Sequence, residues 1–206
     1  MKILEVKALA IPEIKIIKNH RFSDDRGYFV EIFRESDLIK IIPDFKLKQV
    51  NESYSKAGVI RGLHFQWNPY QGKLVRTVRG HMLDIAVDIR LNSPTYGKGI
   101  IYDMLTSEQI DYFESIWIPV GFAHGCVFLE ETIIEYLCTN EYSPTTETGI
   151  SPLSPDIDWS LADKNLVKIF QDTIKNPLVS DKDKAGVNFK DWVNDPRSSN
   201  FIYVRT

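Results

Sequence analysis

The stretch His81-Met-Leu-Asp-Ile-Ala-Val-Asp-Ile-Arg90 has the clearest periodicity in the chain. Its residues Leu83, Ile85, Val87 and Ile89 alternate with residues of mixed polarity. Only a β-strand keeps every second side chain on one face. The pattern therefore predicts a strand over 81–90 that turns one aliphatic face toward a hydrophobic core.

Other short segments rich in β-branched and aromatic residues lie on both sides of this strand. They cover residues 28–33, 59–65, 73–78 and 132–138. Turn dipeptides such as Arg79-Gly80 and Ser93-Pro94 separate them. Many short strands at close spacing favour an antiparallel sandwich or barrel over alternating βαβ units.

The last third of the chain has a different character. Pro144, Pro152 and Pro155 interrupt the alternation, and Asp and Lys become frequent. Short helices are expected over 36–42, 107–113, 160–170 and near 189–193, where capping or acidic residues come first. The 206 residues are interpreted as one mostly β domain, with a β body over about 1–143 and a loop-rich tail over about 144–206 packed on it.

Composition excludes several classes of protein. The 25 Lys and Arg and 28 Asp and Glu give a net charge of −3 without a basic run, so nucleic acid is not expected as a partner. Apolar runs are too short for a membrane span, and the N-terminal segment carries charges where a signal peptide is apolar. Cys126 and Cys138 are too few for a disulfide scaffold, which favours reduced thiols and a cytoplasmic location.

Polar side chains occupy strand positions that are ordinarily apolar. They are Gln49, Asn51, His64, Lys73, Tyr136 and, just past a strand, His124. Singly, each suits a structural role, such as a solvated lysine or a hydrogen-bonded histidine. Gathered in one β body they are costly to bury unless a ligand or a polar network satisfies them, so they predict a pocket.

Several familiar chemical motifs are missing from the sequence. The four histidines form no H-x-H or H-x-x-H pair and no C-x-x-C occurs, so no metal site is expected. The G-x-S-x-G nucleophile motif and Gly-rich phosphate loops are also missing. A bound phosphate would therefore contact Arg and Lys side chains or scattered backbone amides.

A set of segments, in order along the chain, resembles one known family. They are Phe22-Ser-Asp-Asp-Arg-Gly-Tyr-Phe-Val-Glu31, Gln49-Val-Asn51, Gly58-Val-Ile-Arg-Gly-Leu-His-Phe-Gln66, Gln71-Gly-Lys-Leu-Val75, Asp84-Ile-Ala-Val-Asp-Ile-Arg90, Ser93-Pro-Thr-Tyr-Gly97, Pro119-Val-Gly-Phe-Ala-His-Gly125 and Ser180-Asp-Lys-Asp183. Over about residues 22–185 they resemble the dTDP-4-dehydrorhamnose 3,5-epimerases. This resemblance implies a cupin-type double-stranded β-helix, or jelly roll, that uses no cofactor and forms a homodimer.

The resemblance also implies a reaction. The substrate would be a nucleotide-diphospho-4-keto-6-deoxy sugar such as dTDP-4-dehydro-6-deoxy-D-glucose, inverted at carbons 3 and 5 to give dTDP-4-dehydro-L-rhamnose. His64 would be the base, Asp183 its orienting carboxylate, Tyr136 the acid on the far face and Lys73 the cation beside the enolate oxygen.

The same resemblance implies the substrate contacts. Tyr142 would stack on the nucleotide base. Further contacts to the nucleotide, diphosphate and sugar would come from Arg26, Glu31, Gln49, Asn51, Arg61, His124, Glu147 and Lys182. Arg26 and Glu31 would reach the site from the partner subunit. Glu147 in a polar turn and Lys182 in a charged loop also suit plain solvent exposure.

Departures from the family pattern leave alternatives open. Residues 149–160 replace a usual tryptophan-asparagine-aspartate motif, and the spacing from His124 to Tyr136 is one residue short. A single-carbon 3- or 5-epimerase acting on another nucleotide sugar is therefore one alternative. A non-catalytic nucleotide-sugar-binding cupin is a second, and a metal-dependent cupin oxygenase or isomerase is a third.

Overall fold

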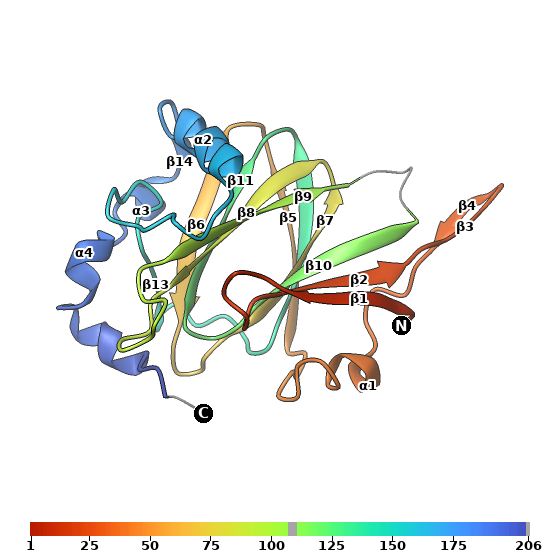
Figure 1. The fold of residues 1–206 in the computed structure, drawn as a ribbon, viewed down its shortest axis with the longest axis horizontal. Coiled ribbons are helices and arrows are strands. Elements are labelled where there is room, and N and C mark those ends of the chain that lie inside the picture. Colours follow the sequence, from red (N-terminus) through yellow and green to blue (C-terminus); the bar gives the residue numbers. More distant parts are fainter. Residues whose placement is uncertain (107–110, 205–206) are drawn as a thin grey trace.

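Regular structure in the computed structural model, which describes residues 1–106 and 111–204, is mainly β (Figure 1). The strands are β1 (Ile3–Ala8), β2 (Lys15–His20), β3 (Phe22–Asp24), β4 (Gly27–Phe29), β5 (Gln49–Ser55), β6 (Val59–Gln66), β7 (Lys73–Arg79), β8 (His81–Asp88), β9 (Gly99–Leu105), β10 (Tyr112–Ile118), β11 (Phe122–Phe128), β12 (Thr132–Cys138), β13 (Glu147–Gly149) and β14 (Leu178–Val179). The helices are α1 (Glu35–Leu38), α2 (Lys164–Thr173), α3 (Asp181–Lys184), α4 (Phe189–Trp192) and the 3-10 helix η1 (Pro196–Asn200).

In the part of the chain that the structure describes, these strands form two large sheets. The first has the order β1-β2-β10-β7-β12-β5, and the second has the order β13-β6-β11-β8-β9 with β14 parallel to β6. Val75, Ile116 and Ile134 of the first sheet pack against Met82 and Phe128 of the second. Two antiparallel sheets packed face to face confirm the mostly β, jelly-roll fold that the resemblance implied.

Strand β8 confirms the strand predicted over 81–90, although it ends at Asp88. Both of its faces are buried, whereas the sequence indicated one. Leu83 and Ile85 pack on the outer side of the second sheet, and Met82 and Ala86 pack between the two sheets. The second sheet is therefore a middle layer, with the tail on one side and the first sheet on the other.

Apolar residues of the tail cover the outer face of the second sheet. Phe170 of α2, Phe189 and Trp192 of α4 and Phe201 join the same core cluster as Leu83. Trp192 is fully buried, and its indole Nε1 donates a hydrogen bond to the Ile89 carbonyl at 3.0 Å. This packing holds the loops of the tail, including α3, against β6.

The predicted helices have mixed outcomes. Helices α2 and α4 confirm those expected over 160–170 and near 189–193, but α2 begins later because Asp163 accepts hydrogen bonds from the Asn165 and Leu166 amides. Helix α1 is shorter than the predicted 36–42. None of the helices in the described ranges is long and apolar enough to cross a membrane.

Two predicted elements are wrong in part. In the helix expected over 107–113, residues 107–110 lie outside the described residues and Tyr112 and Phe113 begin β10. Pairing with β2, where Phe113 lies opposite Asn19, outweighs the acidic helix-start pattern. The strand expected over 28–33 stops at Phe29, because β4 pairs with β3 in a two-stranded hairpin that projects from the body (Figure 1).

Replacing Trp192 with alanine should destabilise the protein by about 3–5 kcal/mol, because it removes a fully buried aromatic side chain and leaves the Ile89 carbonyl without its donor. Urea unfolding measures the change. Val193→Ala is the matched control, since Val193 is 52% exposed and should give almost no change. Equal stability of Trp192→Ala and wild type would contradict the packing described.

Candidate active site

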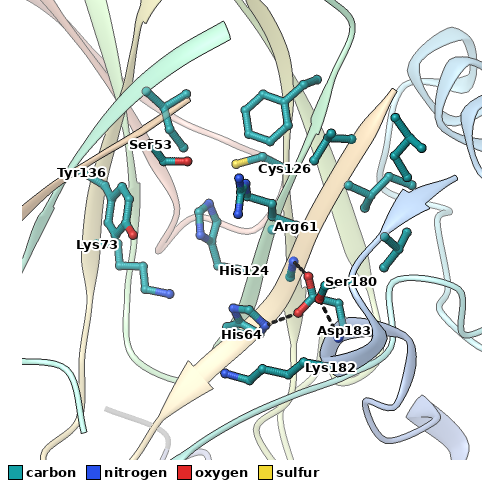
Figure 2. A pocket seen from close by; sticks show the side chains of 18 residues that line it. Ser53, Arg61, His64, Lys73, His124, Cys126, Tyr136, Ser180, Lys182 and Asp183 are labelled. Carbon is teal, nitrogen blue, oxygen red and sulfur yellow. Dashed lines mark hydrogen bonds and ion pairs between the residues drawn. The ribbon is translucent and has the colours of Figure 1, made fainter. Parts of the chain in front are cut away.

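A cavity of about 670 Å³ lies between the sheets (Figure 2). Its polar and charged lining residues are Ser53, Arg61, His64, Lys73, His124, Cys126, Tyr136, Ser180, Lys182 and Asp183. A second cavity of about 330 Å³ also has His64, Lys73 and Tyr136 in its wall. These three side chains therefore lie where the two cavities adjoin.

His64 and Asp183 form a hydrogen-bonded pair. The imidazole Nε2 lies 2.8 Å from Asp183 Oδ1, and the Gly62 amide donates to Asp183 Oδ2 at 3.4 Å. An ionised carboxylate only accepts, so Nε2 carries the proton and the lone pair of a neutral His64 is at Nδ1. That tautomer suits His64 as a base.

The pKa of Asp183 lies below its usual value. Burial alone would raise it, but the hydrogen bond and charge of His64 and the Gly62 amide outweigh burial. Asp183 is on α3, where Ser180 caps the helix by accepting a hydrogen bond from the Asp183 amide. The carboxylate is therefore held both in position and in its charged form.

An irregularity in β6 brings Arg61 and His64 to the same cavity. His64 pairs with His124 of β11 while Arg61 pairs with Cys126, so three steps along β6 match two along β11. This bulge turns both side chains inward despite their odd spacing. At Gly62 (φ +113°) a Cβ would lie 2.6 Å from the His124 carbonyl oxygen, so only glycine fits between Arg61 and His64.

Lys73 and Tyr136 come from the opposite sheet. They lie on the neighbouring strands β7 and β12, where Tyr136 pairs with Val75 and Cys138 pairs with Lys73. Figure 2 shows both side chains reaching into the cavity on the side away from Asp183. Burial lowers the pKa of Lys73 and raises the pKa of Tyr136. The phenol therefore keeps its proton at neutral pH and can donate it.

A second histidine–carboxylate pair backs the cavity wall. His124 Nε2 lies 2.9 Å from Asp84 Oδ2, and Asp84 is almost completely buried on β8. Sequence reasoning assigned His124 to the site but missed Asp84 and Cys126. The sequence does contain a signal for Asp84, because it is a carboxylate in the middle of a predicted strand and its neighbours in the sequence are aliphatic.

Asp84, His124 and Cys126 are also the residues that best fit a metal ion in the described ranges, with one ligand atom each within 4.8 Å of the others. Burial, and next the charge of Asp84, raise the pKa of Cys126 well above its usual value. The His124 Nε2 atom is already engaged in the hydrogen bond with Asp84 Oδ2. A protonated thiol and a satisfied imidazole are poor ligands, so the donor set favours a hydrogen-bonded wall over a metal centre.

The smaller cavity collects four of the residues expected to contact the substrate. Gln49 and Asn51 lie on one face of β5, where the Gln49 amide donates to Asn51 Oδ1 at 2.8 Å. The backbone amide of Tyr142 donates to Gln49 Oε1 at 2.8 Å, and the Tyr142 ring is half exposed. Glu147 completes this wall, with Oε2 at 2.7 Å from Lys182 Nζ.

Two predicted residues lie away from both cavities within the chain. Arg26 is at the tip of the β3–β4 hairpin, where it pairs with Asp24. Glu31 binds the N-terminal amine at 2.8 Å and also pairs with Arg34. One chain alone therefore brings together eleven of the thirteen predicted site residues, those that line one cavity or the other.

Comparison with known proteins matches this cavity to a family. A family model described as dTDP-4-dehydrorhamnose 3,5-epimerase matches residues 8–191. The chain belongs to this family. A dTDP-4-dehydrorhamnose 3,5-epimerase of Sinorhizobium fredii is 44% identical over 158 residues, which are 74% of this chain and 79% of that protein.

Solved structures of the family share the fold. The epimerase of Legionella pneumophila in complex with dTDP-4-keto-L-rhamnose is 32% identical with a TM-score of 0.80, and the match covers 98% of this chain and 99% of that one. A 3′-monoepimerase from Streptomyces bikiniensis in complex with dTDP-quinovose is 25% identical with a TM-score of 0.71, covering 97% and 98%. Both double and single epimerases therefore resemble this chain.

Replacing Asp183 with asparagine should cost stability at neutral pH, and the cost should shrink in acid. A carboxyl pKa held below its unfolded value, about 3.9, stabilises the fold above that pH. This contribution is lost as the pH falls through the folded pKa. Urea unfolding of both proteins from pH 7 to pH 3 measures the gap, and a gap independent of pH would refute the assigned cause.

Proposed function

We propose that the protein inverts carbons 3 and 5 of dTDP-4-dehydro-6-deoxy-D-glucose to give dTDP-4-dehydro-L-rhamnose. The observation that carries this proposal is the placement of a base and an acid on opposite sheets of one cavity. His64, backed by Asp183, comes from the second sheet, and Tyr136 comes from the first with Lys73 beside it. Membership of the epimerase family supports the same reaction.

The chemistry follows from the acidity of hydrogens next to a ketone. Nδ1 of His64 takes the proton from the carbon, the C–H electron pair forms a C=C bond to the ketone carbon, and the C=O π pair moves onto the oxygen to give an enolate. The Lys73 ammonium stabilises that oxygen. Tyr136 then returns a proton to the same carbon from the opposite face, which inverts it, and solvent reprotonates the phenolate.

The nucleotide would occupy the smaller cavity. The half-exposed Tyr142 ring offers a stacking surface, and the Gln49 and Asn51 amides offer donors and acceptors for the edge of a base. Arg61 and Lys182 line the main cavity and carry the positive charge that a diphosphate requires.

Solvent deuterium uptake tests the reaction. In deuterated buffer the wild type should incorporate deuterium beside the ketone, and His64→Ala should slow this by a factor of about 10²–10⁴. Tyr136→Phe should still exchange the substrate but lose inversion by a similar factor. Exchange at the wild-type rate in His64→Ala would contradict the assignment of His64 as the base.

Loss of activity in a metal chelator would favour a metal-dependent cupin, and binding of the nucleotide sugar without any exchange would favour a non-catalytic one.

A single-carbon epimerase is the second candidate. The match to a 3′-monoepimerase over nearly the whole chain supports it, although the identity is only 25%. Nuclear magnetic resonance distinguishes the two, because a double epimerase exchanges hydrogens at both carbons 3 and 5 and a single epimerase exchanges one.

We also propose a homodimer in which each subunit completes the site of its partner. The projecting β3–β4 hairpin exposes Phe22, Tyr28 and Phe29 by 46%, 58% and 67%, an apolar surface suited to burial against a second copy. Arg26 lies at its tip and Glu31 follows it. A hairpin that reaches into the partner would bring both residues to the other cavity.

Mixed dimers test this shared site. His64→Ala and Arg26→Ala should each be inactive alone, but co-expression should restore about a quarter of the sites, since half of the dimers are mixed and each mixed dimer has one intact site. Deuterium uptake measures the recovery. No recovery from dimers shown to be mixed would mean that Arg26 serves its own chain.

We propose a cytoplasmic location as well. Cys126 and Cys138 are both free and buried, which suits a reducing compartment. Fractionation of cells that produce the protein tests this assignment.

A further inference from the structure

Both nitrogens of the His64 ring face a carboxylate. Asp183 holds Nε2 at 2.8 Å, and Glu147 Oε1 lies 3.4 Å from Nδ1. The second distance is longer than a charge-assisted hydrogen bond, which is about 2.7–2.9 Å. Glu147 is thus beside the lone pair of the neutral base without occupying it, and close enough to receive a proton once the ring is charged.

A base that works repeatedly must lose each proton it collects. In a gluco-configured 4-ketose the hydrogens on carbons 3 and 5 lie on the same face of the ring, so one imidazole can remove both. Tyr136 supplies the returning protons from the other sheet, so the proton on His64 is not consumed by inversion. It has to leave by a separate route before the next removal.

We propose that Glu147 provides this route by taking the proton from Nδ1 of His64 and releasing it to water, an inference that rests on the proposed epimerase function. The N–H bond breaks and its electron pair returns to the ring nitrogen as an O–H bond forms on Glu147. The carboxylic acid then gives the proton to solvent. No other reactant is needed.

The surroundings of Glu147 suit this task. Its side chain is 8% exposed, and its second oxygen lies 2.7 Å from Lys182 Nζ, whose side chain is 61% exposed. The hydrogen bond from Lys182 to Glu147 raises the pKa of Lys182, so a charged ammonium lies against the second oxygen of Glu147. Polar groups thus lead from the imidazole to bulk water.

Asp183 is unsuited to the same task. Its oxygens already accept from His64 Nε2 and from the Gly62 amide, whereas Glu147 contacts the exposed Lys182 ammonium. Among the residues that the structure describes, Asp183 and Glu147 are the carboxylates in contact with the His64 ring. Asp183 therefore orients the His64 ring, and Glu147 removes the proton that the ring has taken from the substrate.

Rapid-quench deuterium uptake in Glu147→Gln tests the proposal, since glutamine keeps the shape but cannot accept the proton. At saturating substrate, every later proton removal per active site should be about tenfold or more slower than the first removal in the same variant, whereas the wild type should show equal rates. The trace becomes a burst of one event per site followed by a slow phase. Formate added to Glu147→Ala should restore the later removals, because a small carboxylate replaces the missing one.

Glu141→Gln is the matched control, since Glu141 is exposed and lies outside both cavities; it should behave as the wild type. Equal slowing of first and later removals in Glu147→Gln, or no slowing at all, would overturn the proposal and leave Glu147 as a substrate contact. Wild type that exchanges no hydrogen of any nucleotide-linked 4-keto sugar would instead overturn the proposed function, and this inference with it.

Discussion

The hydrogen bond between His64 and Asp183 joins two parts of the chain that are 119 residues apart. The segments on either side of α3 pack on the second sheet through Val179 and Val187, in the same core cluster as Trp192. The Ser180 cap then fixes the short helix that carries the carboxylate. The packing of the tail therefore determines the tautomer of His64, and with it which ring nitrogen, Nδ1, is free to accept a proton.

Backbone geometry, as well as side-chain chemistry, determines the shape of the candidate active site. Gly62 and Gly125 face each other across β6 and β11 so closely that a Cβ on Gly125 would lie 2.4 Å from the Arg61 carbonyl oxygen. The bulge that this close approach permits turns Arg61 and His64 into one cavity. R-G-L-H-F-Q and G-F-A-H-G, which lie in two of the segments that carry the family resemblance, therefore contact each other directly in the fold.

Much of this arrangement can be predicted from local patterns, and the exceptions have physical causes. Alternation in β8 and the paired amides of β5 are properties of single strands, so the sequence shows them directly. The second buried face of β8 depends on which distant residues cover it, and the strand at Tyr112 depends on pairing with β2. The Asp84–His124 and Glu147–His64 contacts join separate strands, so no spacing along the chain reveals them.

The second sheet has a consequence for how this protein can be altered. Along β11, alternate side chains turn either to the tail core or to the inner face, where Val127 packs in the tail core and Cys126 lines the cavity. Cys126 and Phe128 also belong to the core between the sheets, so a substitution there that alters substrate preference also changes the packing that keeps the protein folded. Redesign of the pocket and redesign of this core are therefore one and the same problem on the inner face of β11.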